Sequence, residues 1–181
     1  MPSARNTDDG KQVGEEVESF IPFHAWGPDK GSRACPICKH GWYNGILYFV
    51  GNHPDWNEIE KWLVFLESEA QRREQYLKVY FIYGNEIAYD QTERRKQLAA
   101  IGTKLNLQKT ALTFVPSLTD SESEIDRNQI DPTRRNTFII YRRSRITGKF
   151  TDLEPTSANF EKIRNHLDAA ENEYFRLEKA N

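Results

Sequence analysis

The sequence predicts an α/β fold of three layers, in which helices cover both faces of a central mixed sheet. Three observations predict it. Apolar runs typical of buried strands alternate with amphipathic segments typical of helices between residues 45 and 117. Two further strand-like runs follow, with a two-residue turn between them. A long amphipathic segment then closes the chain, so parallel strands are expected beside an antiparallel hairpin.

The first two strand and helix pairs have clear boundaries. "GILYFVG" (45–51) and "YLKVYFIYGN" (76–85) are continuous apolar runs, as expected of strands buried on both faces. Each is followed by an N-cap signal, Asp55 and Asp90, with a glutamate three residues later that completes a capping box. The apolar side of the first helix comprises Trp56, Ile59, Trp62, Leu63, Leu66 and Ala70. The second helix is expected within residues 89–107.

The second half of the chain predicts a strand, a long loop, a hairpin and a helix. "ALTFVPS" (111–117) is the third strand, and the polar, turn-rich residues 117–135 are expected to form a surface loop. "NTFIIYRR" (136–143) and "RITGKFTDL" (145–153) are close enough to pair as an antiparallel hairpin. Residues 154–180 are amphipathic with a helical period and form the closing helix, whose last turns are expected to project beyond the core.

The composition indicates one folded domain with a polar N-terminal tail. Of 181 residues, 38% are hydrophobic and 12% aromatic, which is enough for one core. Residues 1–18 contain few sizeable apolar side chains and are predicted to be a disordered tail. We expect the domain to span 19–181, with a core at about 44–170. An N-terminal extension, residues 19–43, carries both cysteines.

Charge and hydropathy exclude several classes of partner. The formal net charge is only -2, so no overall field favours nucleic acid, and nucleic-acid binding is not expected. No apolar run is long enough to span a membrane, and the N-terminus lacks the apolar region of a signal peptide. The default expectation is a cytoplasmic protein, while an extracytoplasmic mature form stays open. The sequence does not fix the oligomeric state.

Both cysteines of the chain lie in one short stretch, "ACPICKHG". A two-residue spacer brings Cys35 and Cys38 close enough to bridge, which favours a redox-active dithiol. A second interpretation is a metal site, with Cys35, Cys38, His24 and His40 as ligands, although no second C-x-x-C is present and metal is not favoured. A third is a structural disulfide or a reduced pair with no role.

Two local motifs resemble known redox proteins. Cys35-Pro36-Ile37-Cys38 resembles the C-P-x-C dithiol of glutaredoxins and disulfide oxidases, and "RRNTFIIYRRSRI" is similar to a peroxiredoxin segment. With the order of strands and helices, the chain resembles the thioredoxin-like superfamily. That resemblance implies a thioredoxin-like three-layer sandwich and thiol-disulfide exchange or redox sensing. Cys35 would attack the partner's disulfide, and Cys38 would resolve the mixed disulfide that forms.

The same resemblance implies helpers and partners. Lys39, His40 and Arg135 would supply positive charge or accept a proton near the cysteines. The partner would be a disulfide or thiol of a protein or a small molecule, and no cofactor is expected.

Three departures from the family pattern keep another hypothesis open. Thioredoxins carry C-x-x-C after the first core strand, where this chain reads "GNHPDWNE" (51–58), and Asn136 stands where the family has a cis-proline. The P-x-x-x-T-x-x-C pattern of peroxidases is absent, so peroxidase activity is not expected. The alternative is a catalytically silent thioredoxin-like binding module that uses a sheet edge or the 117–135 loop.

Overall fold

The computed structural model describes residues 10–40 and 43–179. The strands of its sheet are β1 (Phe23–Trp26), β2 (Asn44–Val50), β3 (Leu77–Tyr83), β4 (Ala111–Phe114), β5 (Thr137–Arg142) and β6 (Arg145–Thr151). The helices are α1 (Pro36–His40), α2 (Trp56–Arg72), α3 (Gln91–Lys104) and α4 (Ser157–Lys179), with a 3-10 helix η1 (Ile125–Asn128). None of the helices in the described ranges is both long and apolar enough to cross a membrane.

The strands form a single mixed sheet in the order β1-β4-β3-β2-β5-β6. The three central strands β2, β3 and β4 run parallel to one another, as the intervening helices require. β5 pairs antiparallel with β2 and with β6, and β1 pairs antiparallel with β4. The predicted mixed sheet and the hairpin are therefore confirmed. In the hairpin turn, Arg143 and Ser144 both have positive φ, which a two-residue connection needs.

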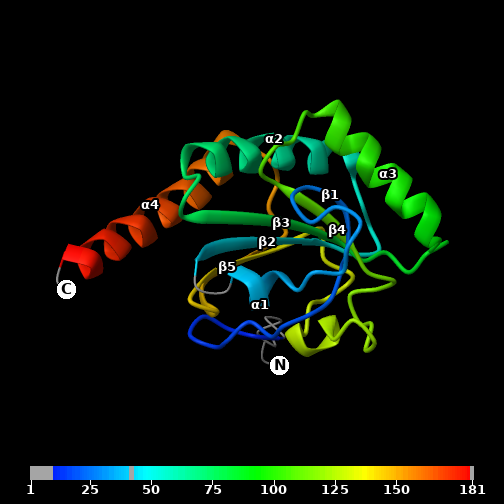
Figure 1. The fold of residues 1–181 in the computed structure, drawn as a ribbon, viewed down its shortest axis with the longest axis horizontal. Helices are drawn as coiled ribbons and strands as arrows, with labels where there is room; N and C mark the ends of the chain where they lie inside the picture. Colours follow the sequence, from blue (N-terminus) through cyan, green and yellow to red (C-terminus); the bar gives the residue numbers. More distant parts are fainter. Residues whose placement is uncertain (1–9, 41–42, 180–181) are drawn as a thin grey trace, which may run out of the picture.

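Alternate residues of the central strands feed two cores on opposite faces of the sheet. On β2, Ile46 and Tyr48 belong to the core beneath α2, α3 and α4, whereas Leu47 and Phe49 belong to the core on the other face. Figure 1 shows the three long helices on one face and α1, η1 and the N-terminal segment on the other. The predicted three layers are present, but the second outer layer consists of short helices and extended chain.

The predicted N-caps are confirmed. The Asp55 carboxylate accepts hydrogen bonds from the backbone N–H groups of Asn57 and Glu58, and Asp90 accepts one from Glu93. These bonds satisfy amides that the first turn of a helix leaves without a partner. Because Asp55 follows β2 closely, α2 begins at the carboxyl end of that strand.

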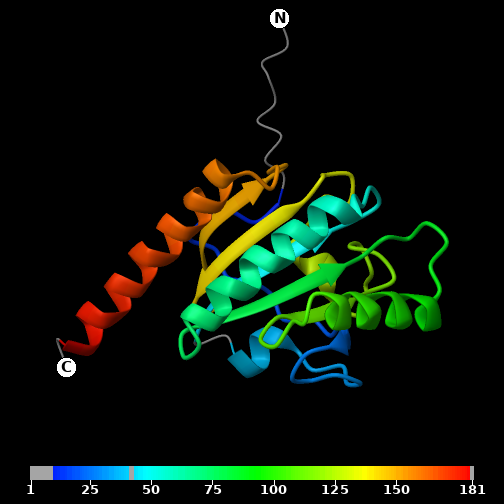
Figure 2. The same ribbon diagram turned by 90° about the horizontal axis from the view of Figure 1, so that it is seen from above.

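Buried ion pairs attach α4 to α2. Glu69 of α2 and Arg73, the C-cap of that helix, are almost fully buried and pair with each other. Arg164 of α4 donates to Glu69 at 2.9 Å, and Arg73 also pairs with Asp168 and Glu171. Each buried charge therefore has an opposite partner, as burial demands. Beyond these pairs α4 extends past the sheet, as predicted (Figure 2).

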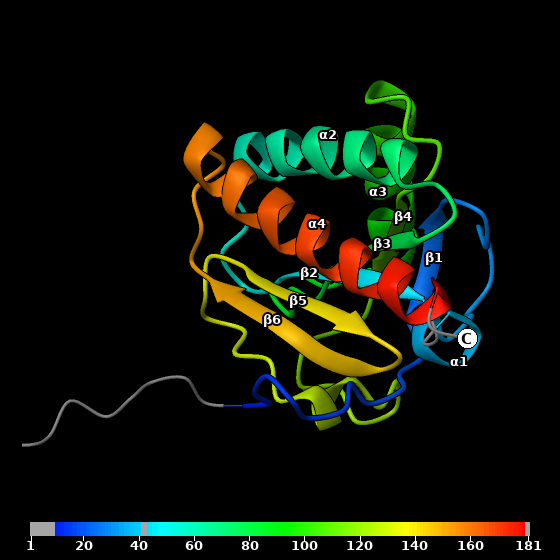
Figure 3. The ribbon, with the colours of Figure 1, turned by 90° about the vertical axis from the view of Figure 1, so that its left-hand side faces the viewer.

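Residues 10–18 differ from the predicted disordered tail. They run along the outer edge of β6, where the backbone N–H of Gly14 donates to Ile146 O and that of Ile146 donates to Glu15 O, both at 2.9 Å. Val17 is only 4% exposed and joins the core on the α1 face. Figure 3 shows this segment beside β6. The backbone groups of an edge strand can order a polar segment that has little apolar surface of its own. Residues 1–9 of the predicted tail lie outside the described ranges.

The 117–135 loop is also less exposed than its composition predicts. Leu118, Ile125 and Ile130 are buried against the sheet on the α1 face. Asn128 of η1 bonds the backbone of Glu18 in both directions, at 2.9 and 3.0 Å. These buried side chains and hydrogen bonds attach the loop to the sheet, and so it forms part of the second outer layer.

A buried carboxylate, Glu67 of α2, holds the connection from α3 to β4. It accepts hydrogen bonds from the backbone N–H groups of Gln108, Lys109 and Thr110 and from the Thr110 hydroxyl. Burial opposes ionisation, but these four donors together outweigh it and hold the pKa of Glu67 below its usual value. The ionised form therefore stabilises the fold.

We expect Glu67→Gln to lower the free energy of unfolding at pH 7 by about 1–3 kcal/mol, because an amide nitrogen cannot accept these bonds. A carboxyl whose pKa is depressed by folding loses its contribution as the pH falls through the folded pKa. The difference between the two proteins should therefore shrink in acid. Urea unfolding over a pH series measures it, with Glu74→Gln, an exposed partner of Lys109, as the control. Equal losses for both variants would contradict the anchoring role.

Candidate dithiol site

The Cys35–Cys38 pair lies at the start of α1. Pro36 is the first helical residue, a position that suits proline because its missing N–H has no helical partner there. Cys35 therefore immediately precedes the helix, and its Sγ accepts a hydrogen bond from the backbone N–H of Cys38 at 3.1 Å. The two sulfurs are joined in a disulfide, with the Cα atoms 5.3 Å apart. The two-residue spacer thus brings the sulfurs together, as the sequence predicts.

The two cysteines differ in their surroundings. Ile37, between them, is 7% exposed and belongs to the core on this face of the sheet. Cys35 is half-buried and packs against the same core, whereas Cys38 is exposed. Tyr80 and Tyr141 form part of the core below. One cysteine of the pair is therefore exposed, while the other packs against the core of the protein.

His24 fixes the chain that leads to Cys35. It is fully buried on β1, and its Nε2 lies 2.8 Å from the carbonyl oxygen of Ala34. Because a carbonyl oxygen only accepts, Nε2 carries the proton and donates it. Burial lowers the pKa of His24, and the bond to Ala34 opposes that shift. A neutral, packed histidine holds the residue before the dithiol.

The proposed helper Lys39 is close to the dithiol but already paired. Its Nζ lies 2.6 Å from Oδ1 of Asp29, in the turn after β1. This pair borders a cleft of about 440 Å³ whose lining also includes Tyr80 and Lys109. The sequence predicts only a turn at Gly27, Pro28 and Asp29, and it gives no signal that Asp29 pairs with Lys39. The side chain of the second helper, His40, lies outside the described side chains.

The structure places the third helper, Arg135, away from the cysteines. Its guanidinium pairs with Glu58 of α2 at 3.4 Å and with Glu154 at 3.3 Å. Thr137, two residues later, pairs with Phe49 near the carboxyl end of β2, whereas α1 leads into the amino end of that strand. Seven residues of extended strand, about 23 Å, separate these ends. Arg135 therefore does not act beside the dithiol, and its pairs belong to the start of α2.

The metal hypothesis requires four groups at one point. The sulfurs of Cys35 and Cys38 are bonded to each other here, and Nε2 of His24 is engaged by Ala34. Within the part of the chain that the structure describes, no three histidine, cysteine, aspartate or glutamate side chains form a metal-binding group. While the two sulfurs are bridged, neither is a thiolate that could bind a metal.

Among the residues that the structure describes, no sulfur lies at the carboxyl end of β2. Asn52 there donates its backbone N–H to Pro132 O at 2.9 Å, so the loop before β5 closes over it. Asn136 bonds Leu153 in both directions with its side-chain amide, at 2.8 and 3.0 Å. No cis peptide occurs among the described residues. Asn136 therefore ties the loop to the segment after β6. The sequence has Asn136 where the family has a cis-proline, and the structure has a trans peptide there.

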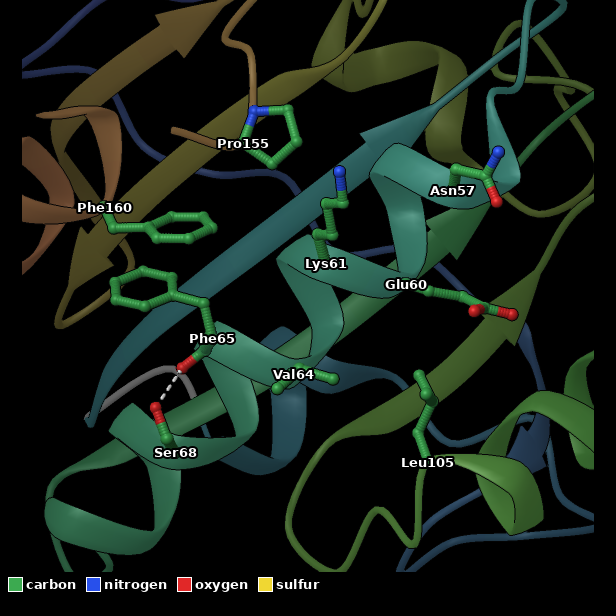
Figure 4. Close-up of a pocket in the computed structure, with 9 residues that line it drawn as sticks. All are labelled: Asn57, Glu60, Lys61, Val64, Phe65, Ser68, Leu105, Pro155 and Phe160. Carbon is green, nitrogen blue, oxygen red and sulfur yellow. Dashed lines mark hydrogen bonds between the residues drawn. The ribbon is translucent and has the colours of Figure 1, made fainter. Parts of the chain in front are cut away.

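A separate cavity of about 700 Å³ lies on the opposite face of the sheet. Figure 4 shows it between α2, Leu105 and the start of α4, with the rings of Phe65 and Phe160 side by side. These rings stack with centroids 4.5 Å apart, and Val64 at the rim is 54% exposed. The sheet separates this apolar cavity from the dithiol, so the two do not form one site.

Comparison with known proteins gives structural matches only. No protein-family model and no curated protein matches the sequence. Among solved structures, BsSco, a member of the Sco family of cytochrome c oxidase assembly proteins, is similar at a TM-score of 0.61 and 11% identity, covering 89% of this chain and 96% of its own. Peroxiredoxin Q from Xanthomonas campestris is similar at 0.61 and 8%, covering 87% and 97%.

The chain has a thioredoxin-like fold. An uncharacterized conserved protein from Geobacillus kaustophilus shares it, with a TM-score of 0.64, 16% identity and coverage of 87% of this chain and 81% of its own. Within this thioredoxin-like fold the dithiol lies near the amino end of β2, on the face opposite α2. The fold predicted from the sequence is confirmed, and so is the displacement of the C-x-x-C motif from the start of the helix that follows the first core strand.

Proposed function

We propose that the protein carries out thiol-disulfide exchange, as an oxidoreductase or a redox sensor, through Cys35 and Cys38. The observation that carries the proposal is a C-x-x-C disulfide with one exposed cysteine at the surface of a thioredoxin-like domain. Similar folds occur in redox proteins, among them peroxiredoxin Q and BsSco, in which a disulfide switch has been identified. The partner is a thiol or disulfide of a protein or a small molecule, and no cofactor takes part.

A redox titration with thiol trapping tests the proposal. The protein is equilibrated in chelated buffers of graded potential, free thiols are trapped, and the reduced fraction is measured by mass. We expect one reversible two-electron transition at roughly -120 to -270 mV, the range of known oxidoreductases. A bridge that stays closed well below about -300 mV would refute the exchange function, because structural disulfides resist reduction there.

A catalytically silent binding module is the second candidate. The absence of a cysteine at the carboxyl end of β2 and the apolar cavity around Phe65 and Phe160 favour it. In that case the disulfide only pins the segment between β1 and β2. Slow alkylation of both reduced thiols at neutral pH, no faster than a thiol of pKa about 8.5, would support this candidate.

A further inference from the structure

We infer that Cys38 is the sulfur that exchanges with a partner and that Cys35 is the resolving thiol. The inference rests on the proposed function, and it reverses the roles that the resemblance to the C-P-x-C proteins implies. It follows from the difference between the two cysteine residues in exposure and in contacts.

Cys38 faces solvent because of its place on α1. Successive residues of a helix point about 100° apart. Ile37 is buried in the core on the sheet, so the next side chain turns away from it, and Cys38 is exposed, as is Lys39. Cys38 is therefore the cysteine of the pair that is exposed to a partner in solution.

Cys35 is held from several sides. It is half-buried against the core that contains Ile37, and its Sγ accepts the backbone N–H of Cys38. The carbonyl of the preceding Ala34 is fixed by the buried ring of His24. A sulfur in this position is less accessible to attack, and its hydrogen bond favours the thiolate that forms when it leaves.

The exchange then has a defined order. A partner thiolate attacks Cys38 Sγ from solvent, a partner–Cys38 bond forms, the Cys35–Cys38 bond breaks, and its electron pair remains on Cys35. A second partner thiolate attacks the partner sulfur of this mixed disulfide, and Cys38 leaves as a thiolate. Two partner thiols become a disulfide, and the cysteine pair gains two electrons and the two protons. The reverse sequence reduces a partner disulfide.

The single variants Cys35→Ser and Cys38→Ser test this order with glutathione disulfide as the probe. We expect Cys35→Ser, which retains Cys38, to form the mixed disulfide roughly tenfold faster than Cys38→Ser, because rates of exchange follow access to the attacking sulfur. Mass spectrometry follows the added glutathione. Equal rates, or faster reaction of Cys38→Ser, would overturn the assignment.

Labelling of the wild-type protein gives a readout that does not depend on a variant's folding. The reduced protein is treated with less than one equivalent of iodoacetamide and mapped by peptide, and the label is expected on Cys38. Label on Cys35, in a protein that still exchanges with glutathione disulfide, would overturn the roles and leave the proposed function standing. No exchange by the wild-type dithiol at all would refute the proposed function itself.

Discussion

The double variant Cys35→Ser/Cys38→Ser is expected to lose all exchange with glutathione disulfide and yet to unfold with a free energy only about 2 kcal/mol lower than that of the oxidised protein. The disulfide closes a loop of only four residues, from Cys35 to Cys38, and a short loop restricts the unfolded chain little. Ile37, His24 and the Lys39–Asp29 pair hold the same segment without the sulfurs. Function should therefore depend on the pair far more than stability does.

Two measurements on the same samples check this expectation. Exchange is followed by the mass of glutathione adducts, and stability by urea unfolding of the oxidised wild type and the double variant. The reduced wild type is the matched control, since it lacks the bridge but keeps both sulfurs. If the double variant fails to fold while the reduced wild type is stable, the serines themselves disturb the core. If both are strongly destabilised, the bridge is structural.

Replacing Trp62 with alanine is expected to lower the free energy of unfolding by about 3–5 kcal/mol, the range for large aromatic residues in a core. Trp62 is fully buried at the centre of α2 and contacts the rings of Tyr48, Phe138 and Phe160. Its Nε1 donates to Leu153 O at 3.3 Å. The alanine variant would therefore lose contacts with the sheet, with α4 and with the chain between them.

Val64→Ala is the control, because Val64 lies on the same helix but is 54% exposed. A surface substitution of this kind changes the free energy of unfolding by about 0.5 kcal/mol or less. Urea unfolding of the three proteins, monitored by circular dichroism, gives both differences. A loss below about 1 kcal/mol for Trp62→Ala would contradict its central role and would indicate that α2 repacks around the gap.

Local patterns were sufficient to predict most of the fold. β2 and α2 follow from an apolar run, a change of period and the cap at Asp55, all within one short segment. The order of the N-terminal segment and the partial burial of the 117–135 loop differ from the prediction, because both come from distant partners. The backbone N–H of Val17 donates to Ser144 O in the hairpin turn, and Ile125 packs in the core on the α1 face of the sheet. Such pairings cannot be obtained from composition.

The same distinction holds for the site. The spacing of Cys35 and Cys38 predicts a bridge, since the contact lies within four residues. Two contacts near the site depend on the turn after β1: the bond from His24 to Ala34 and the ion pair of Lys39 with Asp29. No periodic pattern in the sequence predicts either contact. The expected place of Arg135 beside the cysteines rested on the resemblance alone, and the length of β2 separates Arg135 from them.

The N-terminal segment along β6 also bears on solubility. An uncovered edge strand offers unpaired backbone groups to any other strand, and it is a common origin of aggregation. Here Gly14, Glu15 and Val17 form backbone hydrogen bonds with Ser144 and Ile146 along that edge. At the opposite edge of the sheet, the turn after β1 forms backbone hydrogen bonds with His24. A chain shortened to begin at Ser19 would uncover one of these edges, and edge-to-edge association of its copies would become the main hazard of handling it.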